Sequence, residues 1–480
     1  MSDFKRQHPV ASITSVLELI KQNLVTFLIL LFIGTTRGED SYFLYFFIGG
    51  AVFALVAGVV RWWRFEYRVY GDELQIRKGL FVRSQTFLSK ERIQVIDITE
   101  GLIQRLFGLV KVEIKTAGGG TQTATISAVQ RSEANRLRTE LRKTKTDTEG
   151  DISSEEGVSL ADNEEDRIID SWTISSKDLL LAAFTSGNFG LIASILGATA
   201  GQLDNFINEE TIEYLAEIIP GYSDWTVIVF LILAIIIISW FLSFLGVIFR
   251  YSDFRLDRTS DELIITSGLI ERKHITIPFD RIQAVRFVEG LLRQPFGYGM
   301  IYVESAGYNV NQQETSIVMI PLISRLLLGE AVKRFLPSFD EPEFTIRPPK
   351  KALFRYLRKP AYILVILIPA LWYFLEYGWT SLFLLPLAVY IGWLQYRDAA
   401  LALGDNVLRI RSRFLKRTTA LIRKNRVMNA GLSSNPFQRR KELQKLVVTA
   451  ASGARGIDFE INDLDAEDGL EAFRWVIEHE

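Results

Sequence analysis

The stretch that decides the fold reads Arg92-Ile93-Gln94, then Glu100-Gly101-Leu102, then Phe107-Gly108. It recurs at constant spacing as Arg281-Ile282-Gln283, Glu289-Gly290-Leu291 and Phe296-Gly297. A third copy opens at Gly404-Asp405, carries Arg426-Val427-Met428 where the others read Arg-Ile-Gln, and is shortened before Phe437. Register held over such a length indicates internal repetition. The chain is therefore a triplicated unit, and its function should reside in that unit.

The composition points to a chain with both membrane and water-soluble parts. Of its 480 residues, 48% are hydrophobic and 23% are charged. It contains no cysteine, which excludes disulfides and a cysteine nucleophile, and its three histidines are too scattered to form a metal site. The repeated acids alternate with arginines, which favours ion pairing over acid-base catalysis. We therefore predict no metal, no cofactor and no catalytic residue, and we do not expect an enzyme.

Apolar runs occur in pairs, and each pair directly precedes one copy of the repeat. The runs cover residues 23–36 and 41–60, 179–203 and 225–249, and 360–376 and 379–395. About twenty apolar residues cross the hydrocarbon core, so we predict six transmembrane helices in three hairpins. Basic residues gather on the repeat side of every pair, whereas the segment 204–224 is acidic. This asymmetry predicts a multi-pass cell-membrane protein with both termini and all three repeats in the cytoplasm.

Small and polar residues inside the apolar runs indicate helix packing. Gly50, Ala54 and Gly58 recur at every fourth residue, which favours close contact within one hairpin or, alternatively, between subunits. Asn188 is an amide well inside an apolar run. It is either a packing hydrogen bond or part of a pathway through the membrane.

Inside each copy the pattern changes from helical to alternating. In the first copy, 74–76, 93–98, 112–116 and 123–126 alternate as strands do, and the apolar positions of 127–141 lie on one helical face. The closing helix is expected at 322–336 in the second copy and at 466–477 in the third. Many short strands closed by one helix predict an α+β unit, a small sandwich or partly open barrel capped by that helix.

These motifs, each preceded by a pair of apolar runs, resemble the YdbS/YdbT-like family of bacterial pleckstrin-homology (PH) domain membrane proteins. The resemblance implies a PH-like fold in each copy: two nearly orthogonal antiparallel sheets with a C-terminal helix across one open end. It also implies a location in the bacterial cell membrane, a smaller YdbS-like protein as partner, and a role in envelope defence against membrane-active peptides.

The expected organisation alternates hairpins and domains. It comprises a first transmembrane hairpin (1–64), PH-like domain 1 (65–143), an acidic flexible linker (144–171), a second hairpin (172–250), PH-like domain 2 (251–340), a third hairpin (341–397) and PH-like domain 3 (398–480). The linker has no basic residue from Thr146 to Asp166 and few apolar ones, so it cannot bury enough surface to fold by itself.

Only the third copy is strongly basic. Arg409, Arg411 and Arg413 alternate along an expected strand and share one face, and they are followed by Lys416, Arg417, Arg423, Lys424 and Arg426. Near an anionic inner leaflet each such charge contributes about 1 kcal/mol, so a surface for lipid or a partner is one interpretation. The other is pairing with the chain's own acids, which the C-terminal segment supplies from Asp463 onward. Nucleic acid is not expected, because no aromatic platform interleaves the patch.

The favoured function is a non-enzymatic membrane scaffold whose three PH-like domains bind lipid headgroups or partner proteins. The alternative is a transport or export component with a path through the six helices, in which Asn188 would take part. Charge is scarce inside the apolar runs, which speaks against ion-coupled transport.

Overall fold

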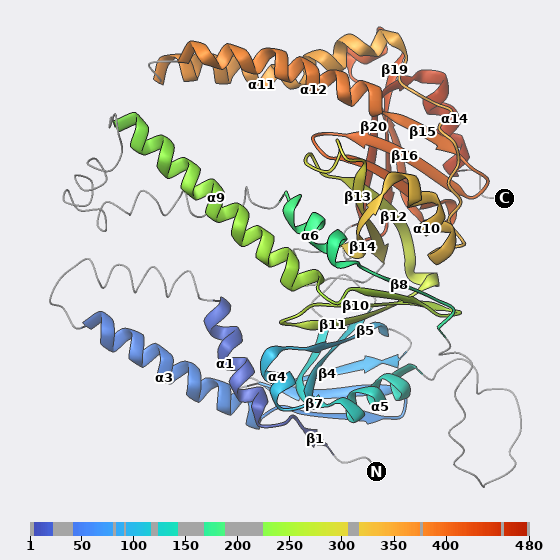
Figure 1. Ribbon diagram of the computed structural model, residues 1–480. Helices are drawn as coiled ribbons and strands as arrows, with labels where there is room; N and C mark the ends of the chain where they lie inside the picture. Colours follow the sequence, from blue (N-terminus) through green and yellow to red (C-terminus); the bar gives the residue numbers. More distant parts are fainter. Residues whose placement is uncertain are drawn as a thin grey trace, which may run out of the picture.

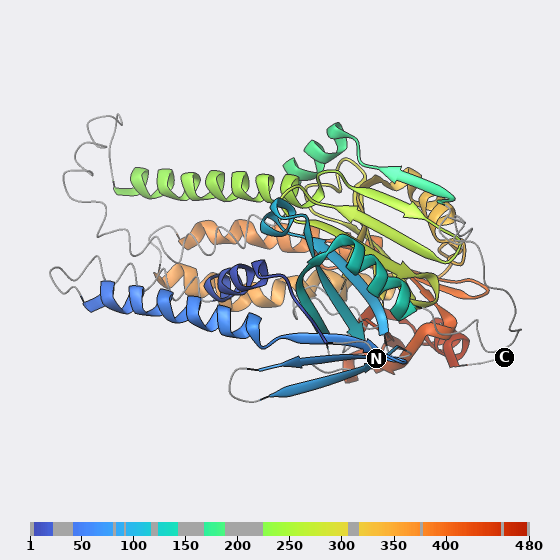
Figure 2. The same cartoon turned by 90° about the horizontal axis from the view of Figure 1, so that it is seen from below.

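The structure is a computed structural model, and it describes residues 4–22, 42–79, 83–90, 93–116, 123–142, 168–187, 224–305, 316–374, 378–452 and 456–477. Three β-rich domains lie in a row, each preceded in the chain by helices (Figure 1). The long helices of all three project from the same side of the row (Figures 1 and 2). A common direction is what one membrane would require of all three sets of helices.

The apolar helices are only partly described. Helices α1 (Val10–Gln22) and α3 (Tyr42–Trp63) precede domain 1, α6 (Ser176–Phe184) and α9 (Asp224–Tyr251) precede domain 2, and α11 (Leu353–Phe374), the 3-10 segment Gly378–Phe383 and α12 (Leu384–Asp398) precede domain 3. Two segments, Ile232–Tyr251 and Gly378–Asp398, are long and apolar enough to cross a membrane, and Ile48–Trp63 is shorter. The six predicted spans and their hairpins stay a prediction, because the run 23–36 and the residues 188–223 lie outside the described ranges.

Domain 1 consists of two antiparallel sheets and a closing helix. The first sheet has the order β1-β2-β3-β4, with strands Lys5–Arg6, Glu66–Tyr70, Glu73–Lys78 and Ser84–Ser89. The second contains β5 (Ile93–Glu100), β6 (Leu109–Thr116) and β7 (Thr123–Gln130), with the short helix α4 (Leu102–Leu106) after β5. Helix α5 (Arg131–Arg142) closes the domain, and its buried Leu137 packs with Leu74 and Ile114 of the two sheets.

Domains 2 and 3 repeat this plan. Domain 2 contains β8 (Asp170–Thr173), β9 (Arg255–Arg258), β10 (Glu262–Ser267), β11 (Arg272–Pro278), β12 (Ile282–Glu289), β13 (Tyr298–Ser305), β14 (Ser316–Ser324) and α10 (Leu328–Phe335). Domain 3 contains β15 (Ala400–Leu403), β16 (Val407–Arg413), β17 (Arg417–Arg423), β18 (Val427–Ser433), α13 (Pro436–Arg439), β19 (Leu443–Ala450), β20 (Ile457–Asp465) and α14 (Ala466–Ile477). This mixed α+β architecture agrees with the expected PH-like fold.

Neighbouring domains share their sheets. Strand β5 of domain 1 pairs antiparallel with β11 of domain 2, which gives one seven-stranded sheet in the order β7-β6-β5-β11-β10-β9-β8. Strand β12 of domain 2 pairs with β17 of domain 3 in a six-stranded sheet, β14-β13-β12-β17-β16-β15. Domain 3 ends in the three-stranded sheet β18-β19-β20. The three repeats therefore form one continuous array (Figure 1).

The closing helices correct part of the sequence interpretation. The prediction that residues 127–141 and 322–336 are helical is wrong at the start of each range, where β7 continues to Gln130 and β14 to Ser324. In both places the last strand pairs with its neighbour, and that pairing outweighs the local helical pattern. The third closing helix, predicted at 466–477, matches α14.

Candidate membrane-facing surface and domain junctions

Two of the alternating arginines of β16 lie against the segment that enters the third group of helices. The guanidinium carbons of Arg409 and Arg411 lie 4.1 and 4.3 Å from the ring centre of Phe344. Arg409 also pairs with Glu341, and Arg411 Nε donates to the Asp398 carbonyl oxygen at 2.6 Å. Burial lowers the pKa of both guanidinium groups. These two arginines therefore hold the domain to its own approach segment.

A buried carboxylate cluster holds the junction between domains 2 and 3. Glu289 ends β12 and pairs with Arg417, which starts β17 and lies directly opposite in the register. Glu289 also pairs with Arg325, while Asp398 at the end of α12 pairs with Arg413 and, at 3.5 Å, with Arg417. Burial raises the pKa of Glu289, an effect that the neighbouring Arg325 opposes. The cluster ties domain 2, domain 3 and the end of α12 together.

Two more of the predicted basic residues reach the other end of this junction. Arg423 donates to the carbonyl oxygens of Ile282 and, at 3.1 Å, of Phe279. Arg426 donates to the carbonyl oxygen of Asp280 at 2.6 Å. Arginines of domain 3 therefore hydrogen-bond to the backbone of domain 2 at and beside its Asp-Arg-Ile motif.

The remaining basic residues of the predicted patch are the two lysines. Lys424 Nζ lies 5.1 Å from the ring centre of Trp475, and Lys416 is exposed at the turn between β16 and β17. The six arginines contact carboxylates, carbonyls or an aromatic ring of their own chain, and the carboxylates are Glu289, Glu341 and Asp398 rather than the C-terminal acids. A lipid-binding role of the patch stays a prediction, and it applies best to Lys416.

The junction between domains 1 and 2 has a similar plan. Arg272, which starts β11, lies opposite Glu100, which ends β5. Arg138 of α5 pairs with the buried Glu262 of β10 at 3.1 Å. Charged side chains therefore flank the strand pairing at this junction as well.

His274 should make the first junction sensitive to pH. It lies opposite Ile98 in the β5–β11 pairing, its Nδ1 lies 2.9 Å from Thr266 Oγ1, and burial lowers its pKa. The nearby charges act in both directions: they are Glu100, which raises its pKa, and Arg131, Arg272 and Arg138, which lower it. Because the unfolded chain binds the proton more tightly, stability is full above a pH of about 6.5 and falls as the pH drops toward the lowered pKa.

We expect His274→Gln to remove this part of the pH dependence. The thermal midpoint of the purified chain should fall less between about pH 7 and pH 5 in the variant than in the wild type. His8→Gln, at an exposed histidine outside the junction, is the control for replacing a histidine as such. Equal slopes for all three proteins would contradict the assignment.

The repeat signature forms an exposed apolar turn in domain 1. Gly101 caps α4, and Gly108 follows that helix with a φ of 65°, a conformation that favours glycine. Between them Leu106 is 82% exposed and Phe107 is also exposed. Ile103 packs on the start of α1 and the end of α3, so the turn lies beside the helices that enter the domain.

Domain 2 builds an equivalent turn. It opens at Gly290, and Gly297 has a φ of 70°. Leu291 is exposed and Phe296 is 66% exposed. The same sequence signature therefore places apolar side chains outside the domain core in both copies.

The buried Arg293 anchors this second turn to α6, and sequence reasoning missed it. Its guanidinium group donates to the carbonyl oxygen of Ala182 at 2.9 Å, to Thr185 Oγ1 at 3.1 Å and to the Pro321 carbonyl oxygen at 3.1 Å. Burial lowers its pKa. Gln104 is its counterpart in domain 1 and donates to the Ser127 carbonyl oxygen at 3.3 Å. The sequence signal that could have found it is a polar residue, Gln104 or Arg293, at the same repeat position of an otherwise apolar turn.

Domain 3 keeps the turn in altered form. Phe437 in α13 is 67% exposed. Next to it, Gln438 donates to Asp463 Oδ1 at 2.8 Å, and Arg355 of α11 donates to the same oxygen at 2.8 Å. Glu442 stands where the other copies have the Phe-Gly glycine and has a φ of 54°. Three exposed basic residues follow Gln438 in the chain: Arg439, Arg440 and Lys441.

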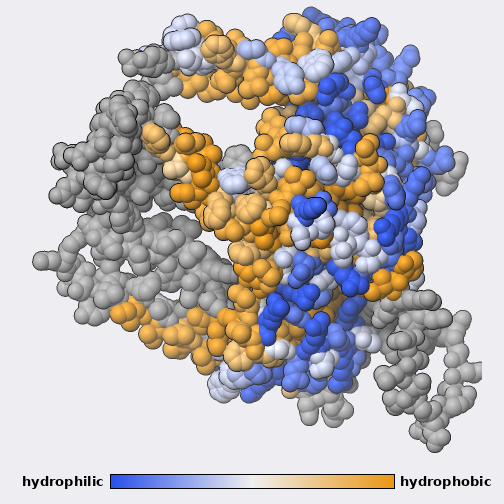
Figure 3. All heavy atoms as spheres, in the orientation of Figure 1, coloured by the Kyte–Doolittle hydropathy of each residue, from blue (hydrophilic) through white to orange (hydrophobic). Residues whose placement is uncertain are grey.

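All three turns thus lie at the end of each domain that its own helices enter. In Figure 3 the hydrophobic colour covers the projecting helices and continues onto the adjoining side of the domains, whereas the opposite side is mostly hydrophilic. Such a division is typical of a protein whose one face meets an apolar environment.

Other residues of the repeat signature pack inside the domains. Ile282 is fully buried, Gln283 Nε2 donates to the Arg281 carbonyl oxygen at 3.0 Å, and Ile93 packs against the core of domain 1. Gln94 belongs to β5, and Arg92 lies outside the described residues.

The predicted packing residues lie in α3 and in the undescribed part of the apolar run 179–203. A Cβ added to Gly58 would lie 2.6 Å from Val16 Cγ2 of α1, so this glycine packs inside its own pair of helices. Gly50 is partly exposed and Ala54 lies in the same helix, one turn before Gly58. Asn188 lies outside the described residues, and so does the pathway predicted around it.

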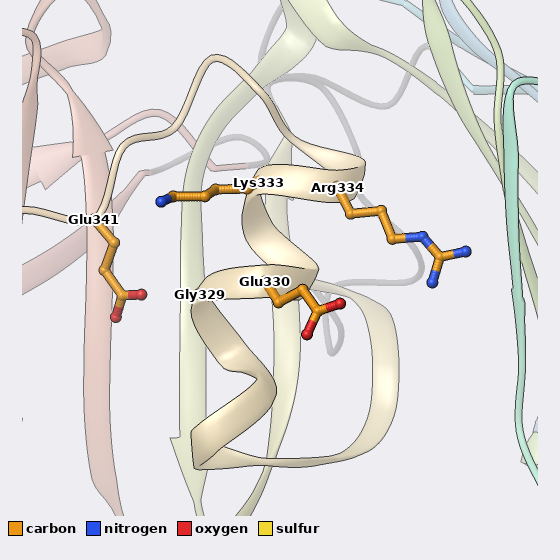
Figure 4. A pocket seen from close by; sticks show the side chains of 5 residues that line it. All are labelled: Gly329, Glu330, Lys333, Arg334 and Glu341. Carbon is orange, nitrogen blue, oxygen red and sulfur yellow. The ribbon is translucent and has the colours of Figure 1, made fainter.

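A shallow hollow of about 670 Å³ beside α10 is lined by Gly329, Glu330, Lys333, Arg334 and Glu341 (Figure 4). Two of its four charged residues already have ion-pair partners in the chain, since Arg334 pairs with Asp170 and Glu341 with Arg409. The hollow faces away from the helices and is not our candidate site.

Comparison with known proteins agrees with the repeat and the fold. The family described as "Bacterial PH domain" matches residues 12–145, 211–327 and 355–479. The UPF0699 transmembrane protein YdbT of Bacillus subtilis (strain 168) is 31% identical over 488 residues, which cover 99% of this chain and 98% of YdbT. YdbS of the same organism is 28% identical over 105 residues, or 22% of this chain and 64% of YdbS. No solved structure matches. This chain therefore belongs to the bacterial PH domain family, as a triple-domain membrane protein of the UPF0699 type.

Proposed function

We propose that the chain is a non-enzymatic membrane scaffold whose three PH-like domains rest on the cytoplasmic leaflet and bind lipid headgroups or a partner protein. The observation that carries this proposal is the repeated turn: each domain exposes apolar side chains beside the helices that lead into it, Leu106 in the first, Phe296 in the second and Phe437 in the third. Exposed apolar side chains at that place have a natural neighbour in the interfacial region of the bilayer.

Charge supports the same orientation. The exposed Lys416 adjoins the exposed Phe414 and Leu415, and a basic run follows Phe437. Near an anionic leaflet each such cation contributes about 1 kcal/mol, and the aromatic rings add apolar contact. Anionic phospholipid is therefore the lipid class we propose.

The shared sheets supply the rigidity that a scaffold needs. Because β5 pairs with β11 and β12 pairs with β17, the domains cannot turn independently without breaking backbone hydrogen bonds. We propose that this array presents a fixed surface to a YdbS-like partner, in a role in envelope defence. Affinity isolation of the whole chain from native membranes tests the partner, and recovery of no membrane protein would refute it.

We expect the three turns to contact lipid. Since the chain has no cysteine, Leu106→Cys, Phe296→Cys and Phe437→Cys each accept one fluorescent probe. In nanodiscs containing anionic phospholipid, nitroxides near the lipid headgroups should quench each probe several-fold more than a probe on Lys333→Cys, an exposed position of α10 on the far side. Equal quenching at all four positions would show that the domains stand clear of the membrane.

A further inference from the structure

The two domain junctions repeat one set of contacts. In each, a strand ending in glutamate pairs antiparallel with a strand starting in arginine: Glu100 lies opposite Arg272, and Glu289 lies opposite Arg417. We name these the receiving strand (β5, β12) and the incoming strand (β11, β17). The junctions are therefore built by one rule rather than by two unrelated contacts.

A second contact recurs beside the strands. Arg105 of the first signature turn donates to the Leu269 carbonyl oxygen at 3.4 Å, and Gln294, at the same repeat position in domain 2, donates to the Leu415 carbonyl oxygen at 3.1 Å. In both cases the turn after the receiving strand reaches the hairpin that opens the incoming strand. Both joints thus share the strand pairing, the placing of glutamate opposite arginine and the contact from the turn. The ion pair across the strands joins Glu289 to Arg417, whereas Glu100 pairs with Arg131 of its own domain.

At each end of the three-domain array, one strand that corresponds to a receiving or an incoming strand has no neighbouring domain paired with it in the described part of the chain. In the described part of the chain, β4 of domain 1 lies at the edge of its sheet and corresponds to the incoming strands, and β18 of domain 3 lies at the edge of its sheet and corresponds to the receiving strands. Figure 2 shows the strands of the first sheet along the lower border of the molecule. A head-to-tail interface of this type can add further domains at both ends unless the end strands differ from those inside the array.

The charges differ between the two ends. Domain 1 keeps the incoming arginine, because Arg83 directly precedes β4, stands where Arg272 and Arg417 stand in the other copies, and is exposed. At the other end Ser434 replaces the receiving glutamate. A second copy of this chain would therefore bring serine, not glutamate, to Arg83.

We propose that the β4 edge binds a separate bacterial PH domain whose receiving strand ends in an acidic residue, which pairs with Arg83. Binding by strand addition extends the first sheet, as β11 extends β5 within the chain. The joint also suits a membrane partner, because domains joined in this way project their helices to the same side (Figure 2). The inference rests on the partner-binding part of the proposed function and adds the place and chemistry of the contact.

Photo-crosslinking from the edge tests the proposal. Gln85→Cys, exposed on β4, is coupled to a benzophenone in the full-length chain and irradiated in membranes of the source organism. The expected adduct maps to a PH-domain strand that ends in an acid. Adding Arg83→Glu should lower its yield about tenfold, whereas Lys333→Glu should not. An unchanged thermal midpoint excludes misfolding as the cause.

Purified chain alone gives a second, independent readout. Ser434→Glu restores the acid to β18, so it should create Gln85-linked adducts between copies, and Arg83→Glu should abolish them. Native adducts to β18 of a second copy would overturn the assigned partner. A co-isolated partner without an edge adduct would overturn the edge alone, and failure to isolate any partner would refute the proposed function.

Discussion

Replacing Glu289 with alanine is expected to lower the free energy of local opening at the junction of domains 2 and 3 by about 3–5 kcal/mol. The Glu289 side chain is almost fully buried and pairs with Arg417 and Arg325. Arg417 is itself buried, so deletion of the carboxylate leaves a desolvated cation with only Asp398, at 3.5 Å, to balance it. The cost comes from that uncompensated charge more than from a lost contact.

Hydrogen exchange of the β17 amides measures this effect. In Glu289→Ala these amides should exchange far faster, because β17 pairs with β12 through the register that Glu289 ends. Glu330→Ala, which removes an exposed carboxylate on α10, is the matched control and should leave β17 protection within about 0.5 kcal/mol of the wild type. Wild-type protection in Glu289→Ala would show that the backbone pairing alone holds the junction.

The sequence predicted the repeat, the family and the α+β architecture, because each depends on patterns that are local to one copy. It could not predict that β5 pairs with β11, because strands pair through backbone groups, which are the same whether the neighbouring strand comes from the same domain or from another. The arginines of β16 show the same limit. Alternation placed Arg409 and Arg411 correctly on one face, but their contact with Phe344 depends on how distant segments fold back. The basic character of the third copy was therefore visible and its structural use was not.

The third copy also shows how a repeat can drift while its fold persists. In domains 1 and 2 the left-handed position of the turn is a glycine, Gly108 or Gly297. In domain 3 Glu442 has a φ of 54° at the equivalent position. A non-glycine residue there costs on the order of 1 kcal/mol. Lys351 lies 3.9 Å from its carboxylate and offsets little of that cost, since the carboxylate is exposed. Sequence comparison alone placed the shortening before Phe437 and missed this substitution.

Gly392→Ala is expected to destabilise the chain by about 1–3 kcal/mol, although alanine is the better helix former. A Cβ at this position of α12 would lie 2.4 Å from the Tyr356 carbonyl oxygen and 2.7 Å from Leu357 Cα of α11. Both are backbone atoms, so no side-chain rotation relieves the overlap and the two helices must separate. Gly246→Ala in α9 is the matched control, because nothing lies within 4 Å of its added Cβ. It should stabilise by about 0.5–1 kcal/mol.

Opposite shifts of the thermal midpoint in these two variants would establish that α11 and α12 pack through Gly392, whereas equal shifts would contradict it. The structure predicts a further consequence at a distance. Helix α12 ends at Asp398, whose carboxylate pairs with Arg413 and Arg417, so displacing the helix should also loosen the junction cluster. The effects of Gly392→Ala and Glu289→Ala on β17 exchange should then be non-additive, because both act on the partners of Arg417. Coupling of that kind would link the packing of the apolar helices to the alignment of the three domains.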